Sequence, residues 1–299
     1  MSATSSHLLI KPNLSKPEYI SVSPESAGWE HLHFAAVKLK KGQQWSFETG
    51  EYELAMIIFG GTCAVKSNRG NWSHLGSRTD VFHGMPTTLY FSRSTRFNVT
   101  AENDDLDFAC GWAKTEKEYS PVLIRPEEVA AELRGGENAS RQINKMIPPG
   151  FNCDRLVVVE AYTPSGNWSS YPPHKHDQRL FDQTGKIIEA DLEEIYFYKF
   201  DRPEGYAYQR IYTDDRKLDE LMLVEDSHLV LAPEGYHSVV AAQGYNTYYL
   251  NILAGSDQSL ACSDDPAYSW VKDTWKEKDA RLPLVSLKMN SGYEEVKMT

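Results

Sequence analysis

The stretch SSYPPHKHDQR, residues 169–179, contains the feature on which the interpretation of the sequence depends. Its two histidines, His174 and His176, are one residue apart and follow a pair of prolines. Residues i and i+2 of a β-strand face the same side, so both imidazoles can approach one point while Lys175 faces away. Imidazoles at this spacing suit a divalent metal, although a lone His-x-His pair is also a common accident. Further ligands must therefore decide whether this is a metal site.

The rest of the chain is organised mainly as short strands. Apolar, β-branched and aromatic runs are separated by Gly, Pro, Ser and Asn, which is the pattern of a sandwich or barrel. We expect strands at residues 33–39, 53–59, 87–92, 107–113, 155–162, 194–200, 207–213, 228–233 and 248–254.

One segment breaks this pattern. RPEEVAAELRGG (125–136) has a proline at its start, acidic residues in the first turn and glycine at its end, so it predicts a short helix. We place a linker that contains this helix at residues 125–150. It separates an N-terminal domain, 1–124, from a C-terminal domain, 151–299.

The two halves are expected to derive from an ancient duplication. A shift of 141 positions aligns residues 87–101 with 228–242, and it places Glu53 on Glu194. The alternative is that two strand-rich domains match by chance. The first half has no counterpart of the His-x-His pair, and it carries Arg96 at the position of His237. Only the second half is therefore expected to hold a metal.

Composition restricts the partners and the location. The net charge is −11 and the acidic residues are spread along the chain, so a nucleic acid is not an expected partner. The sequence contains no run of about 18 apolar residues, so it predicts no membrane helix, and its N-terminus lacks the pattern of a secretory signal. The widely spaced cysteines, Cys63, Cys110, Cys153 and Cys262, are expected to be reduced thiols. We therefore expect a cytoplasmic protein.

A glutamate and a histidine that follow the histidine pair in the sequence can complete a metal site. Glu194 begins an expected strand after a polar connection, and the adjacent Glu193 is an alternative. His237 follows a Pro-x-Gly turn in APEGYH, which leads into another strand. Three nitrogens and one oxygen suit Zn, Mn, Fe(II) or Ni and can leave positions open for a substrate.

The order His-x-His, Glu, Pro-x-Gly-x-His within a β-rich domain resembles the cupin superfamily. The strings YPPHKHD, LEEIYFYKF, QRIYTDD and PEGYHSVVAAQGYNTYYLNILAG resemble the 5-deoxy-glucuronate isomerase family of myo-inositol catabolism, and the resemblance covers most of the chain. It implies an all-β bicupin fold, with two antiparallel β-barrel or jelly-roll domains joined by a short helix. The N-terminal domain would be the degenerate one.

The resemblance also implies an enzyme and a ligand set. The family converts 5-deoxy-D-glucuronate to 2-deoxy-5-keto-D-gluconate, an aldose–ketose isomerisation, and one divalent metal per chain is implied. The implied ligands are His174, His176, Glu194 and His237. Glu194 is preferred over Glu193 because it directly precedes Ile-Tyr-Phe-Tyr, as in related uronate isomerases.

An aldose–ketose isomerase must move a hydrogen between C1 and C2, by proton transfer through an enediolate or by a hydride shift. A sugar-acid substrate also brings a carboxylate, which calls for local positive charge. The candidate acid–base residues are Asp177, Glu220 and Tyr249. The candidate substrate-binding residues are Lys175, Arg179, Arg210 and Asn251. Asp177 can instead orient a histidine, Lys175 can be solvated, and Tyr249 can belong to the core.

Other functions are compatible with the same ligands. They include a related uronate ketol-isomerase, an Fe(II) cupin dioxygenase and a non-enzymatic sugar-binding bicupin. We also expect a homo-oligomer, because sheet edges readily pair with a second copy.

Overall fold

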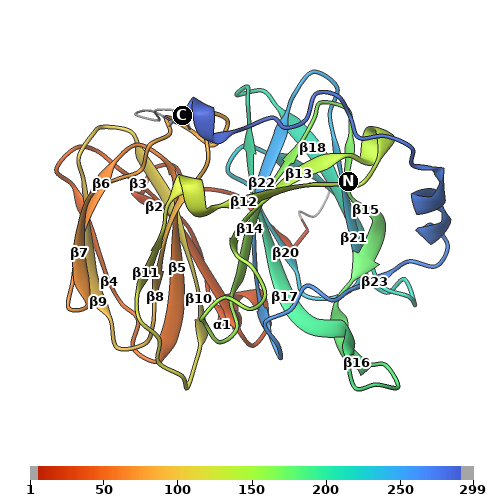
Figure 1. Cartoon of the computed structure of the whole chain (residues 1–299), viewed down its shortest axis with the longest axis horizontal. Coiled ribbons are helices and arrows are strands. Elements are labelled where there is room, and N and C mark those ends of the chain that lie inside the picture. Colours follow the sequence, from red (N-terminus) through yellow and green to blue (C-terminus); the bar gives the residue numbers. More distant parts are fainter. Residues whose placement is uncertain (1–5, 291–299) are drawn as a thin grey trace, which may run out of the picture.

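The computed structural model describes residues 6–290 and consists almost entirely of β-structure. Figure 1 shows two barrel-shaped halves side by side, the first coloured red to yellow and the second green to blue. In the described part of the chain, the helices are short: α1 (Pro24–Ala27), η1 (Pro126–Glu128), η2 (Glu137–Ala139), η3 (Ser269–Thr274) and η4 (Leu287–Met289). Within residues 6–290, no helix combines the length and apolar character that crossing a membrane requires.

The first half contains two antiparallel sheets. The larger sheet has the order β11-β8-β5-β10-β3-β2, and the smaller has the order β4-β9-β6-β7. The strands of the larger sheet are β2 (Glu18–Val22), β3 (Leu32–Leu39), β5 (Tyr52–Gly60), β8 (Thr87–Phe91), β10 (Leu106–Lys114) and β11 (Val122–Ile124). Those of the smaller sheet are β4 (Gln44–Glu48), β6 (Cys63–Ser67), β7 (Gly70–Leu75) and β9 (Arg96–Ala101).

The second half repeats this arrangement. Its larger sheet has the order β1-β20-β17-β22-β14-β13-β12, with β16 also paired to β17, and its smaller sheet has the order β19-β18-β21-β15-β23. The strands of the larger sheet are β1 (Leu9–Ile10), β12 (Ala130–Arg134), β13 (Arg141–Ile147), β14 (Val157–Thr163), β16 (Asp177–Phe181), β17 (Ile187–Phe200), β20 (Leu229–Ala232) and β22 (Thr247–Gly255). Those of the smaller sheet are β15 (Trp168–Lys175), β18 (Tyr206–Tyr212), β19 (Asp219–Glu225), β21 (Tyr236–Ala241) and β23 (Ser263–Asp264). All nine expected strands are confirmed, and with them the all-β bicupin fold.

The helix expected over residues 125–136 is wrong. The proline and the acidic residues form only the single 3-10 turn η1, and residues 130–134 form the edge strand β12, which pairs with β13. Pairing with a neighbouring strand therefore overrides the local helix signals. Gly135 does not end a helix: its φ is +75°, and a Cβ there would lie 1.9 Å from the carbonyl oxygen of Ala139. This glycine serves the tight turn between β12 and η2.

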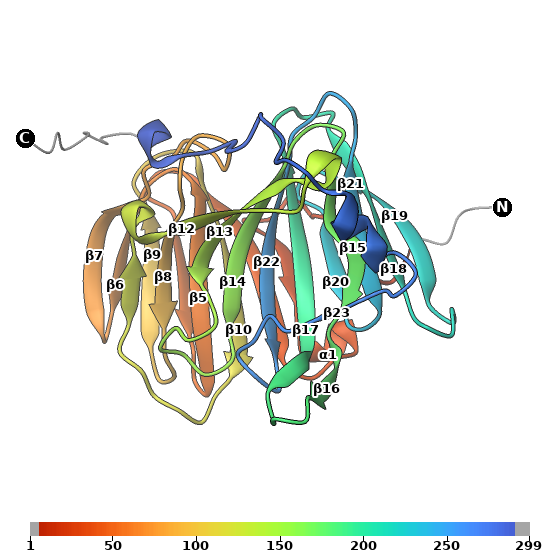
Figure 2. The same cartoon turned by 45° about the vertical axis from the view of Figure 1, so that its right-hand side comes forward.

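The two large sheets pack against each other and form the main core (Figure 2). Phe197 of β17 stacks on Phe59 of β5 with ring centroids 5.2 Å apart. A Cβ on Gly111 of β10 would lie 2.4 Å from Cδ1 of Ile252, so the close approach of β10 to β22 requires glycine. A separate apolar cluster fills the interior of the first barrel, and it includes two of the four free cysteines, Cys63 and Cys110.

Two buried glutamates join the halves in the same manner. Glu53 of β5 accepts hydrogen bonds from the backbone N–H groups of residues 154–156, at 2.8, 2.6 and 3.0 Å. Glu193 of β17 accepts hydrogen bonds from the backbone N–H groups of residues 30–32 in the first half. Each carboxylate thus binds the chain just where a strand of the opposite large sheet begins, β14 in one case and β3 in the other.

This reciprocity corrects the alignment of the halves by one residue. Glu53 pairs with Ala113, and Glu193 pairs with Ala254, the residue that the duplication places on Ala113. Glu53 therefore corresponds to Glu193. A shift of one position in a strand exchanges the two faces of the sheet, so the counterpart of Glu194 is an apolar residue, Leu54.

We predict that Glu193→Ala lowers the free energy of unfolding by about 2–4 kcal/mol, because three backbone N–H groups lose a charged acceptor in a buried place. Glu193→Gln keeps one acceptor oxygen and should cost less. Chemical denaturation measures both values, with Glu204→Ala in an exposed turn as the control. An equal stability of the Glu193→Ala and Glu204→Ala proteins would contradict this role.

Candidate metal centre

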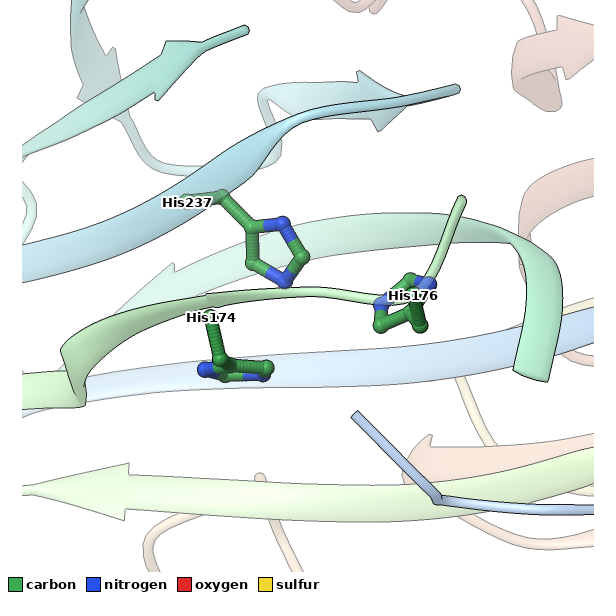
Figure 3. Close-up of side chains that lie close together, drawn as sticks. All are labelled: His174, His176 and His237. Atoms are coloured by element: carbon green, nitrogen blue, oxygen red, sulfur yellow. The ribbon is translucent and has the colours of Figure 1, made fainter. Parts of the chain in front are cut away.

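Three strands of the second barrel bring the four predicted ligands together. His174 lies near the end of β15, with His176 just beyond it, while Glu194 lies in β17 and His237 in β21. Figure 3 shows the three imidazoles grouped at one place, and one nitrogen from each lies within 4.8 Å of the others. The Oε2 atom of Glu194 is 3.0 Å from Nε2 of His176 and 3.3 Å from Nε2 of His237.

Backbone carbonyls fix the orientation of two of the imidazoles. Nδ1 of His176 lies 3.0 Å from the carbonyl oxygen of Leu192, and Nδ1 of His237 lies 3.0 Å from that of Gly235. A carbonyl only accepts, so each Nδ1 carries a proton and each Nε2 faces the cluster, where the Nε2 of His176 also lies within hydrogen-bond distance of Glu194. The Nε2 atom of His237 is buried and makes no hydrogen bond. An inward-facing lone pair without a donor is what a metal ligand requires, so the donor set fits a divalent cation.

The turn that precedes His237 is held by Asp177. Gly235 has a φ of +86°, and a Cβ there would lie 2.7 Å from the carbonyl oxygen of Tyr212, so this position requires glycine. The backbone N–H of Gly235 donates to Oδ2 of Asp177 at 2.7 Å. Asp177, which begins β16 directly after His176, thereby connects this part of the chain to the turn before His237. This contact favours the orienting role for Asp177 rather than a direct catalytic one.

Burial and mutual charge set the protonation of the cluster. Desolvation lowers the pKa of the His174 imidazole well below its usual value, and the neighbouring His237 and His176 lower it further. Desolvation acts in the same direction on His176, but the hydrogen bond and the charge of Glu194 outweigh it and raise the pKa of His176. Desolvation alone would raise the pKa of Glu194; the hydrogen bond to His176 and the closeness of the His176 and His237 imidazoles instead hold that pKa far below the usual range. Glu194 is therefore a carboxylate, able to bind a cation, at physiological pH.

His174, His176 and Glu194 of the cluster line a pocket of about 530 Å³. Tyr249 and Asn251 of β22 both line it, as their alternation along the strand predicts. The hydroxyl of Tyr249 lies 2.6 Å from Oγ of Ser169 and 3.2 Å from Oγ of Ser170, and the amide of Asn251 donates to the carbonyl of Ile195. The tyrosine hydroxyl is thus part of a buried polar group within the pocket.

Several other predicted residues are not brought to the pocket. The three cations are each bound by a carboxylate at 2.7 Å: Lys175 by Asp214, Arg179 by Asp257 and Arg210 by Asp219. None of them lines the pocket, and the side chains of Arg179 and Arg210 are about half exposed to solvent. Glu220 lies on β19, at the far edge of the smaller sheet, with its carboxylate 3.8 Å from His7.

Sequence reasoning missed pocket residues that come from the segment assigned to the linker. Arg134 of β12 and Arg141 of β13 both line the pocket, as does Ile143. Treating residues 125–136 as a helix hid the pairing that brings Arg134 opposite Arg141. The available signal was the strand-like run RQINKMI, in which Arg141 and Ile143 face the same side.

Two barrels packed through their large sheets, with a cluster of three histidines and a glutamate inside the second, define a bicupin that has, within residues 6–290, one candidate metal centre. Solved structures support the fold: an oxalate decarboxylase from Lactobacillus farciminis has a TM-score of 0.62, 8% identity, and covers 88% of this chain and 89% of its own. A mutant of the Bacillus subtilis oxalate decarboxylase has a TM-score of 0.63 with 12% identity and covers 93% of this chain and 88% of its own.

The sequence then gives the particular family. Residues 8–271 match the KduI/IolB family, and the chain belongs to it. A 5-deoxy-glucuronate isomerase from Geobacillus thermodenitrificans is 40% identical over 256 residues, which are 85% of this chain and 91% of that protein. The enzyme of the same name from Bacillus subtilis strain 168 is 34% identical over 84% of this chain and 91% of its own. An IolB-like protein from Salmonella typhimurium LT2, solved as a crystal structure, is 35% identical with a TM-score of 0.84, over 88% of this chain and 98% of its own.

We predict that the purified protein binds about one divalent metal per chain and that the double variant His174→Ala, His237→Ala loses it, because the remaining pair binds weakly. Metal analysis after dialysis measures the stoichiometry. His83→Ala, which alters an exposed histidine of the first half, is the matched control. Full metal content in the double variant would show that the metal binds elsewhere.

Proposed function

We propose that this chain is a metal-dependent aldose–ketose isomerase that converts 5-deoxy-D-glucuronate to 2-deoxy-5-keto-D-gluconate in the cytoplasmic catabolism of myo-inositol. The observation that carries the proposal is the cluster of His174, His176, Glu194 and His237 beside a pocket, in a chain whose relatives bear the name of that enzyme. A divalent metal held by these four side chains would act as a Lewis acid on the carbonyl and hydroxyl oxygens of the sugar acid.

The residues of the chain supply positioning and proton transfer. Glu194 is ionised and buried, so it serves as a ligand rather than as a proton donor. Tyr249 is the better placed acid–base candidate, because this residue lines the pocket and its hydroxyl exchanges hydrogen bonds with Ser169 and Ser170. Through these hydroxyls a proton can be held and returned at the substrate oxygens.

The alternatives differ in chemistry rather than in ligands. A related uronate ketol-isomerase would use the same pocket with a different sugar acid, and an Fe(II) dioxygenase would consume oxygen. A non-enzymatic bicupin would bind a sugar without turnover. The family names favour the isomerase, and self-association through sheet edges remains a separate proposal.

We predict chelator-sensitive formation of the keto acid from 5-deoxy-D-glucuronate. Activity should disappear after treatment with a chelator and return on addition of one of Zn, Mn, Fe(II) or Ni, because the charge that develops on the substrate oxygens needs the cation. Product is followed by NMR, with oxygen uptake measured in parallel. Oxygen consumption without keto acid would instead indicate a dioxygenase.

We predict that Tyr249→Phe lowers kcat by about 10²-fold or more while the metal content stays unchanged, as expected for loss of a proton-transferring group. In D2O, the wild-type product should gain solvent deuterium at the carbon that receives the hydrogen. A product without deuterium would mean a hydride shift. Unchanged kcat in Tyr249→Phe would remove this residue from the mechanism.

A further inference from the structure

Four basic side chains line the pocket of the candidate metal centre, and three of them are already engaged. Arg134 is paired with Glu132 at 3.0 Å, Lys272 binds the carboxylate of Asp264, and Lys278 donates to the carbonyl of Gly135. These three contacts hold their cationic groups along the rim. They leave little positive charge for an anion that enters.

Arg141 is the exception. Within residues 6–290 no carboxylate pairs with it, and its Nε atom is buried without a hydrogen-bond partner. A buried guanidinium nitrogen without an acceptor is costly, and most such groups in proteins are bonded. The missing acceptor is therefore expected to come from a molecule that binds in the pocket.

The position of Arg141 on β13 directs it inward. Arg141 and Ile143 alternate along the strand and both line the pocket that contains the histidines. Gln142, between them, belongs to the opposite face, where its amide donates to Asn144 and to the carbonyl of Val285. Because the sheet fixes this alternation, the Arg141 side chain lies on the face of β13 that borders the pocket, and its Nε atom is buried there.

We propose that Arg141 binds the carboxylate of the sugar-acid substrate and thereby determines specificity for uronates over neutral sugars. This proposal rests on the proposed isomerase function. A guanidinium presents a rigid fork that matches a carboxylate through two hydrogen bonds, and it stays charged at any physiological pH. With the anionic end held by Arg141, the opposite end of the substrate, which carries the reacting carbonyl, is directed to the histidine cluster.

The expected effect is a loss of discrimination rather than a loss of catalytic chemistry. A site built around a charged partner rejects a ligand that lacks it far more strongly than an apolar wall does. Arg141→Met should therefore lower kcat/KM for 5-deoxy-D-glucuronate by about 10²–10³-fold, mainly through KM. For the neutral amide of this sugar acid, the same variant should have the same kcat/KM as the wild type.

The test uses the metal-loaded full chain, with kcat and KM measured for the acid and for its amide. Arg134→Met, a neighbouring rim arginine already paired with Glu132, is the matched control and should lose less than about tenfold, and Arg141→Lys should recover part of the loss because it restores charge without the fork. Metal content should be unchanged in all variants. Equal losses on acid and amide, or an unchanged kcat/KM for the acid, would overturn the proposal.

A second measurement separates this proposal from the function on which it rests. Calorimetric binding of D-glucuronate to the metal-loaded wild type and to Arg141→Met does not depend on turnover. Binding that requires Arg141, in a wild type that does not isomerise 5-deoxy-D-glucuronate, would refute the isomerase and support the carboxylate site. Equal binding to both proteins, or no binding to either, would refute the carboxylate site.

Discussion

Two consecutive carboxylates of β17 point in opposite directions, and the arrangement of the molecule depends on this alternation. Glu193 faces the first half and accepts the backbone N–H groups at the start of β3, whereas Glu194 faces the barrel interior and meets His176 and His237. Both are buried, so each needs its partners. The strand that joins the two halves therefore also supplies the oxygen of the candidate metal centre, and a slip of one residue would destroy both contacts.

The same register explains why, among the described residues, the ligand cluster forms in the second barrel and not in the first. In the first half, the positions that correspond to the ligands hold other residues. Leu54 stands at the position of Glu194, and Arg96 stands at the position of His237. Glu48 pairs with Arg96 in the same way as His174 pairs with His237, so Glu48 stands at the position of His174. Leu54 belongs to the apolar cluster that fills that barrel. The first barrel is thus a packed core, and it contributes Glu53 and a large apolar face to the second. Its contribution is to the fold, while the pocket and its polar side chains belong to the second barrel.

The sequence predicted what depends on local pattern. Long apolar runs predicted nine strands. The spacing of His174 and His176 predicted a metal site, because residues i and i+2 lie on the same face of a strand and this alternation depends only on local sequence. It did not predict the edge strand β12, since strand pairing there outweighs the helix signals of residues 125–136. Of the strands in the smaller sheets, only β18 was among the nine expected. The prediction that cations near the histidines in sequence, such as Lys175 and Arg179, bind the substrate rested on sequence distance alone. Their partners are distant in sequence, whereas Arg141 is close to the histidines only through the pairing of β13 within the large sheet.

The central claim is that one metal is held by three histidines and Glu194 in the second barrel. Anomalous diffraction from crystals of the metal-loaded protein, recorded at the absorption edge of the bound metal, tests it most directly. We predict one peak per chain, about 2.0–2.3 Å from the ligand atoms of His174, His176, Glu194 and His237, with no peak in the first barrel. A peak bound by other residues, or a metal that contacts the histidines while Glu194 lies out of reach, would contradict it.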